Sequence, residues 1–212
     1  MNDIVPLGPD ELAGLDALEH EANKDSFEKL LKFVKGEYIT KDGVIPHGTQ
    51  FIAHCKWYTK CWVKFIKNQM IEKRLYRVFL KEVPPGRDTL DCQDKKEWEI
   101  GLGGTPRDPW ILQSMLPFEP LVGEGEPLVF VSATKTGKPV VSSLVTLYKR
   151  HARDTGHINE MPVIELSVSS FTKAGIGKVI LPLFKHVGWN DGAARDIKVE
   201  TLKDEMDDEI PF

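Results

Sequence analysis

The feature that most constrains the fold is a regular alternation of side chains through residues 50–66. One set of alternate positions is nearly all apolar and reads Phe51, Ala53, Cys55, Trp57, Thr59, Cys61, Val63, Phe65. Side chains of a β-strand point alternately to the two faces of a sheet, so the pattern predicts one long, bent strand with this set facing a core. A turn at Asn68 and Gln69 then predicts a hairpin, with a second strand at residues 71–81.

The opposite face of this hairpin carries lysines, arginines and aromatic rings. Unpaired ammonium groups are not tolerated in a protein interior, so we expect the face to be exposed to water or covered by something anionic. Lysines neutralise phosphates and aromatic rings stack on bases, and the two together bind single-stranded DNA without reading its sequence. An ordinary exposed sheet face has a similar composition. The candidate DNA-binding residues are Lys56, Tyr58, Lys60, Trp62, Lys64, Arg74, Tyr76 and Arg77.

The rest of the chain predicts a mainly β fold with minor α-helix. The helical spacing of Phe27, Leu30, Leu31 and Val34 predicts a helix near the N-terminus, and a second helix is expected at residues 137–156. Further strands are expected at residues 110–116, 128–133, 163–171 and 179–187, with a long loop at residues 83–109. This order predicts an OB-fold, which is a five-stranded Greek-key barrel with a helix between its third and fourth strands. A mixed α+β sandwich has a similar order.

Charge divides the chain into a basic body and two acidic ends. Residues 1–28 contain eight acids and one base, and residues 204–212 contain five acids and no base. The remaining residues have 27 bases and 19 acids, a net charge of +8. We therefore expect an acidic, helical N-terminal extension at residues 1–45, an OB-fold domain at 46–189, and a short linker with an acidic tail at 190–212. A basic body favours a polyanionic partner, although a merely soluble surface can carry the same charge.

Three cysteines, Cys55, Cys61 and Cys92, cannot all pair within one chain. Their small number favours a reducing compartment. No apolar run approaches the roughly 20 residues that a membrane-spanning helix needs. The acidic N-terminus is unlike a secretory leader. These observations predict a cytoplasmic protein that has no membrane partner.

The last residues form the most specific motif of the chain. A solubilising acidic tail gains nothing from ending in exposed apolar residues, whereas a peptide ligand gains a ring for an apolar pocket and a carboxylate for a basic one. This ending is similar to the acidic tip of bacterial single-stranded-DNA-binding proteins, and the body is divergent, of the kind that phages carry. The matching residues are Asp207, Asp208, Glu209, Ile210, Pro211 and Phe212, with Glu209 in place of an aspartate.

The resemblance implies a non-enzymatic protein with an OB-fold. Such a protein coats and protects single-stranded DNA in replication, recombination and repair, and recruits partner enzymes through its tip. The resemblance also implies a place in a bacterial host cell or its nucleoid. It needs no cofactor or metal, and homo-oligomers occur in the family. A recombination mediator or strand-annealing protein would share the basic face and the tip.

Three weaker patterns point to other chemistry. His47, His54, Cys55 and Cys61 lack zinc-ligand spacing, and the two thiols are more simply small core residues. Glycine–lysine pairs at residues 137–138 and 177–178 lack the frame of a phosphate loop, so both are interpreted as turns. A metal-dependent nuclease would need clustered acids. The acids crowded in the 83–109 loop are Asp88, Asp91, Asp94, Glu97, Glu99 and Asp108.

Overall fold

The computed structural model describes residues 29–101, 104–122, 125–175 and 177–190. Within them, ten strands join in one mixed sheet. The strands are β1 (Lys29–Val34), β2 (Glu37–Thr40), β3 (Gly43–Ile45), β4 (Gln50–Ala53), β5 (Thr59–Ile66), β6 (Gln69–Arg77), β7 (Trp110–Pro120), β8 (Leu128–Ser132), β9 (Met161–Lys173) and β10 (Gly177–Asn190). The helices are α2 (Gly137–Thr155) and the 3-10 helices η1 (Cys55–Trp57), η2 (Val78–Leu80), η3 (Arg87–Thr89) and η4 (Lys95–Glu97).

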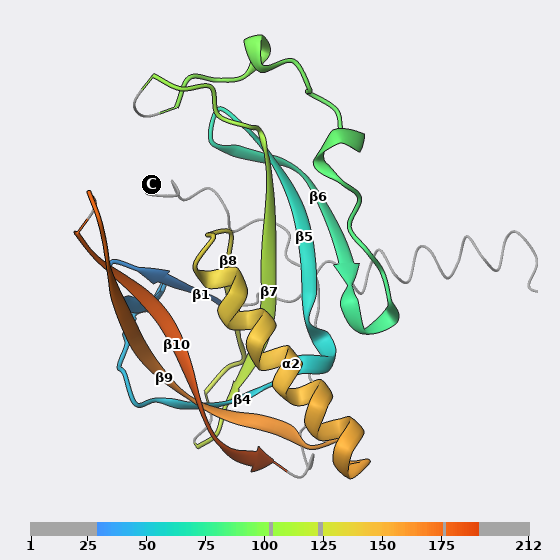
Figure 1. Cartoon of the computed structure of the whole chain (residues 1–212), viewed down its shortest axis with the longest axis vertical. Helices are drawn as coiled ribbons and strands as arrows, with labels where there is room; N and C mark the ends of the chain where they lie inside the picture. Colours follow the sequence, from blue (N-terminus) through green and yellow to red (C-terminus); the bar gives the residue numbers. More distant parts are fainter. Residues whose placement is uncertain (1–28, 102–103, 123–124, 176, 191–212) are drawn as a thin grey trace, which may run out of the picture.

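The sheet follows the order β10-β9-β4-β7-β8-β1-β2-β3, with β5 and β6 attached beside β7. All of these strand pairs are antiparallel except β1 with β8. The sheet curls into a half-barrel, and α2 lies across it between β7 and the β9–β10 pair (Figure 1). The mainly β prediction is confirmed, and the half-barrel is compatible with an OB-like fold, but a five-stranded Greek-key barrel is not confirmed.

The main core lies between α2 and the curled sheet. Val141, Leu144, Val145 and Tyr148 of the helix are buried in it, together with rings from β7, β8 and β10 such as Phe118, Phe130 and Phe184. The predicted helix is thus confirmed, as is the predicted loop, whose described residues hold 3-10 turns and one isolated β-bridge, between Ile100 and Pro106. No helix of the described residues is both long and apolar enough to cross a membrane.

The chain interrupts the predicted long strand at residues 54–58. Six steps from Ala53 to Thr59 match only three steps on β7, from Phe118 to Met115, so the extra residues loop out as η1. Paired residues share a face of the sheet, and three steps is an odd number. The apolar set therefore changes face: Ala53 joins the main core, whereas Cys61 joins a second cluster on the other face of β7.

The N-terminal helix prediction is wrong for the described residues. Lys29–Val34 form strand β1, which pairs in parallel with β8 and antiparallel with β2. Leu31 of this strand is fully buried. Tertiary pairing therefore overrides the local helical spacing, and residues 29–45 contribute three strands to the same sheet as the rest of the body.

Candidate functional site

The two rings proposed for base stacking are buried. Tyr58 is 4% exposed, and its hydroxyl lies 3.2 Å from the hydroxyl of Ser114 on β7. Trp62 is 7% exposed and donates its indole N–H to the carbonyl of Pro85 over 3.0 Å. Its ring meets Trp110 edge-on, with centroids 6.4 Å apart. The expectation of an exposed stacking face at these two positions is therefore wrong.

The chain itself supplies the anion that covers this face. Lys64 is 8% exposed, and its ammonium group lies 2.5 Å from the carboxylate of Asp91 in the 78–109 segment. The indole N–H of Trp110 donates to the same carboxylate over 2.6 Å. The hydrogen bond from Lys64, followed by that from Trp110, holds the pKa of Asp91 below its usual value. Asp91 of the loop thus neutralises Lys64, which the sequence analysis had predicted to contact DNA.

The other predicted site residues differ in their contacts and in their exposure. Lys56 donates to the side chain of Asn159 over 2.6 Å. Arg74 pairs with Glu72 at 2.6 Å and lies 4.9 Å from the centre of the Trp110 ring. Tyr76 packs partly buried against the Trp62 cluster, Arg77 is exposed, and Lys60 is half-buried. The structure does not bring these side chains together as one exposed surface.

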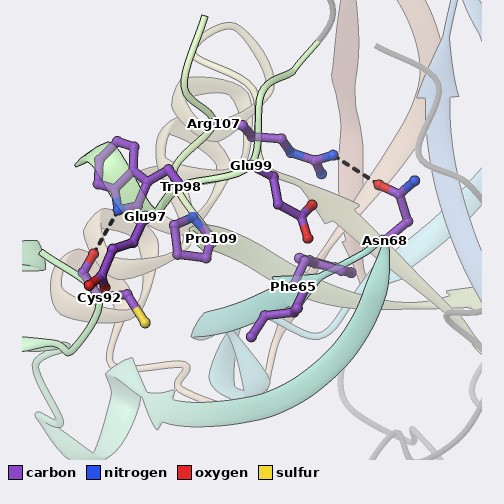
Figure 2. A pocket seen from close by; sticks show the side chains of 9 residues that line it. Phe65, Asn68, Cys92, Glu97, Trp98, Glu99, Arg107 and Pro109 are labelled. Atoms are coloured by element: carbon purple, nitrogen blue, oxygen red, sulfur yellow. Dashed lines mark hydrogen bonds between the residues drawn. The ribbon is translucent and has the colours of Figure 1, made fainter. Parts of the chain in front are cut away.

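A small cavity of about 140 Å³ lies between residues 92–99 of the long loop and the end of β5 (Figure 2). Arg107 donates to the side chain of Asn68 over 3.0 Å, and the backbone N–H of Lys67 donates to Glu99 over 2.6 Å. The indole N–H of Trp98 donates to the carbonyl of Cys92 over 2.8 Å. The bonds to Asn68 and Lys67 anchor the loop to the β5–β6 turn, whereas the bond between Trp98 and Cys92 lies within the loop.

The acids of the loop do not converge on a metal position within the described residues. Asp108 accepts from Arg87, as Asp91 does from Lys64. In the described part of the chain, one group offers three ligand atoms within 4.8 Å of one another, and it lies elsewhere: His151, His157 and Glu160. The geometry thus offers no support for the nuclease alternative.

The two cysteines considered for zinc are buried in separate clusters, as predicted for small core residues. Cys55 lies in the main core and Cys61 in the second cluster. His54, which is 4% exposed, bonds to Glu119 at 3.1 Å, and burial lowers the pKa of this histidine.

A basic cleft of about 580 Å³ opens where the parallel strands β1 and β8 end. Its walls come from the end of β1 with the following turn, the β8–α2 turn, and β10. Lys32, Lys35 and Lys178 line it, and none of the three forms an ion pair with a described residue. Apolar side chains such as Phe33 and Ile180 complete the walls.

Polar groups converge at the inner end of this cleft. Ser132, Thr134 and Thr136 form a chain of hydroxyls, each 3.2 Å from the next, and Thr134 accepts from the first N–H of α2. Gly137 is needed there, because a Cβ would lie 2.0 Å from the Ser132 oxygen. Gln113 also lines the cleft; it is 4% exposed, and its amide has no partner among the described residues. A buried amide without a hydrogen-bond partner lowers the stability of the fold, so a polar ligand that bonds to this amide would recover that free energy.

Positive charge also lies at the start of α2, outside the residues that line the cleft. Burial, and then the nearby charge of Lys60, lower the pKa of Lys138 in the first turn of α2. The three lysines that line the cleft, none of which forms an ion pair with a described residue, favour an anionic ligand. Sequence reasoning missed this cleft because its lysines come from distant segments, and it interpreted residues 136–138 only as a turn.

Comparison of the chain with protein-family models, curated proteins and solved structures found no match.

Proposed function

We propose that this protein binds single-stranded DNA through the basic cleft, without reading its sequence, and recruits replication, recombination or repair enzymes through its C-terminal tip. The observation that carries the proposal is the cleft itself, whose three lysines and buried Gln113 amide have no ion-pair or hydrogen-bond partner among the described residues. The protein protects the strand and keeps it unpaired, and it performs no chemistry on it.

The charge of the body supports a polyanionic ligand. The described residues contain 24 lysines and arginines and 15 acids, a net charge of +9. Several of the acids are already used in ion pairs inside the fold, such as Asp91 and Asp108. The unpaired lysines of the cleft therefore meet phosphates without competition from neighbouring carboxylates in the described residues.

The composition of the cleft supports a single strand in particular. Lysines at its rim neutralise phosphates, and apolar walls with Phe33 cover a base. A base enters such a cleft only when it is neither paired nor stacked in a duplex. The amide of Gln113, which has no partner among the described residues, would bond to the edge of any base in the cleft, because an amide both donates and accepts. The half-barrel is compatible with an OB-like fold, and we propose that it is a divergent one.

The acidic tip supports the recruitment half of the proposal. Its residues, 207–212, lie outside the described residues, so the support is the sequence motif alone. Acidic residues before the terminal Ile-Pro-Phe are expected to compete weakly with DNA for the lysines, and to be released when DNA binds. Deleting residues 210–212 should leave DNA affinity intact and abolish capture of repair enzymes from a bacterial lysate.

The cleft is tested by removing its charges and measuring the salt dependence of binding. The test variant is Lys32→Gln/Lys35→Asn/Lys178→Gln; Asn is used because Lys35 has a φ of +51°, which Asn tolerates. The matched control, Lys96→Gln/Lys149→Gln/Arg150→Gln, removes the same charge from exposed positions. Binding of a labelled oligo-dT is followed by anisotropy between 50 and 200 mM salt.

We expect the cleft variant to bind at least about tenfold more weakly and to lower the slope of log affinity against log salt by about 2, since each lost phosphate contact on a single strand removes about 0.7. The control should change the slope by less than half as much. Equal losses in the two variants would refute the cleft as the binding site. Acceleration of duplex formation between complementary strands would favour the annealing alternative.

A further inference from the structure

A cluster of two histidines and one glutamate closes the C-terminal end of α2. His151 lies in the last turns of the helix, and His157 and Glu160 lie in the connection to β9. The Nε2 of His151 is 2.6 Å from one carboxylate oxygen of Glu160, and the Nδ1 of His157 is 2.6 Å from the other. All three ligand atoms lie within 4.8 Å of one another.

The surrounding structure holds these side chains in place. The ring of His151 stacks flat on Trp189 of β10, with centroids 3.6 Å apart and planes inclined by 11°. Gly156, with a φ of +77°, ends the helix and turns the chain back, and Tyr148 donates to the carbonyl of Ile158 over 2.8 Å. The side chains of His151 and Glu160 are 15% and 25% exposed, whereas that of His157 is 61% exposed. The cluster is therefore fixed on its inner side and open to solvent on its outer side.

We propose that His151, His157 and Glu160 bind a divalent transition-metal ion of the zinc class. Imidazole nitrogens with one carboxylate form a known type of three-ligand zinc set, which leaves a fourth position for water. Ligand atoms on a tetrahedral ion with bonds of about 2.0–2.1 Å lie about 3.3 Å apart. The two nitrogen–oxygen contacts would open by less than about 1 Å, through rotation of the exposed His157 for one contact and of the Glu160 side chain for the other.

The electrostatics of the cluster suit a cation. The carboxylate of Glu160 lies between two imidazoles, each with a nitrogen 2.6 Å from one of its oxygens. No lysine or arginine forms an ion pair with Glu160 in the described part of the chain. An ion would replace two hydrogen bonds by three coordination bonds.

The ion would cross-link segments that are separate in the sequence. It would join the end of α2 to the start of β9, and through the stacked Trp189 to the end of β10. The site lies at the opposite end of α2 from the basic cleft, so it does not depend on the DNA-binding proposal. Loss of the ion should therefore destabilise the contacts between the end of α2, the start of β9 and the end of β10, and leave the cleft lysines in place.

The experiment titrates Zn²⁺ and Co²⁺ into the full chain after treatment with a chelator. We expect one ion per chain and a Tm higher by about 5–10 °C when the free ion reaches 100 times its Kd. Co²⁺ should quench the fluorescence of Trp189, because the ring stacks on a ligand, and Trp189→Phe should lose that quenching while still binding.

His157→Ala and Glu160→Gln should each weaken Zn²⁺ binding by at least about 100-fold. His157 is largely exposed, so its removal spares the fold, and His47→Ala, at another exposed histidine, is the matched control that should bind as the wild type does. No binding at 100 μM Zn²⁺, or equal binding by wild type and His157→Ala, would overturn the proposal. The second outcome would put the ion at other ligands, such as the acidic tail.

Discussion

Replacing Trp62 by alanine tests whether its ring stabilises the fold or contacts DNA. The side chain is 7% exposed, its indole N–H donates to Pro85, and its ring packs edge-on against Trp110. The hydrogen bond attaches β5 to the 78–109 segment, and the ring contact attaches it to β7. If this description is right, the substitution destabilises the fold and leaves the affinity of the folded protein for DNA unchanged.

The magnitude follows from the burial and the two specific contacts of Trp62. A buried tryptophan removes about 150–250 Å² from water, which at about 25 cal/mol per Å² is about 4–6 kcal/mol. Alanine retains a small part of this, and the loop relaxes into part of the cavity. Observed Trp→Ala losses are about 3–5 kcal/mol, and roughly 1 kcal/mol of that belongs to the hydrogen bond. We therefore expect the free energy of unfolding to fall by about 3–5 kcal/mol.

Urea denaturation followed by circular dichroism measures this loss. Trp57→Ala is the matched control, because Trp57 is 45% exposed and its substitution should cost less than about 1 kcal/mol. Oligo-dT binding is compared at a temperature where both variants are folded, and each affinity should lie within twofold of wild type. A loss below about 1 kcal/mol for Trp62→Ala, or a tenfold loss of DNA affinity in the folded variant, would refute the reasoning.

Three further predictions follow from the described contacts. Asp91→Asn should lower stability at pH 7. Lys64 holds the pKa of Asp91 below its usual 3.8, so the stability advantage of the wild type over this variant should be lost as the pH falls below 3.8. Urea midpoints of both proteins from pH 2 to 7 measure the difference, and a difference that does not change with pH would mean that the Asp91 carboxylate has no partner. Thiol labelling at pH 8 should modify only Cys92 rapidly, since the other two thiols are buried; three equal rates would contradict that burial. Gly137→Ala should cost about 1–3 kcal/mol in thermal unfolding, because the added methyl meets Ser132, and a variant as stable as the wild type would contradict that close approach.

The elements that the sequence predicted correctly are those whose signals are local. The helix at residues 137–155 has buried residues at helical spacing and a glycine at its end, and the β5–β6 hairpin turns at Lys67 and Asn68, one residue before the predicted turn. The N-terminal strand shows the limit of such signals. Phe27, Leu30, Leu31 and Val34 have helical spacing, yet β1 forms because two neighbouring strands satisfy its backbone and its Leu31 is fully buried.

The candidate site was the least predictable part of the molecule. Alternation placed Lys60, Trp62 and Lys64 on one face of a strand, which is how they lie in β5. What covers that face depends on a loop more than twenty residues away, whose Asp91 meets Lys64. The basic cleft likewise gathers Lys32, Lys35 and Lys178 from both ends of the described chain.

The sequence by itself determined a mainly β body with one central helix, an uneven distribution of charge and a C-terminal motif, because periodicity, composition and a terminal motif are properties of neighbours along the chain. Only the tertiary structure decided which face of each strand meets solvent. A three-residue excess between Ala53 and Thr59 reverses the apolar set across the sheet, and that excess is defined only against the register of β7. Burial of a side chain depends on the partner strand and the covering loop, and neither is encoded in the alternation itself.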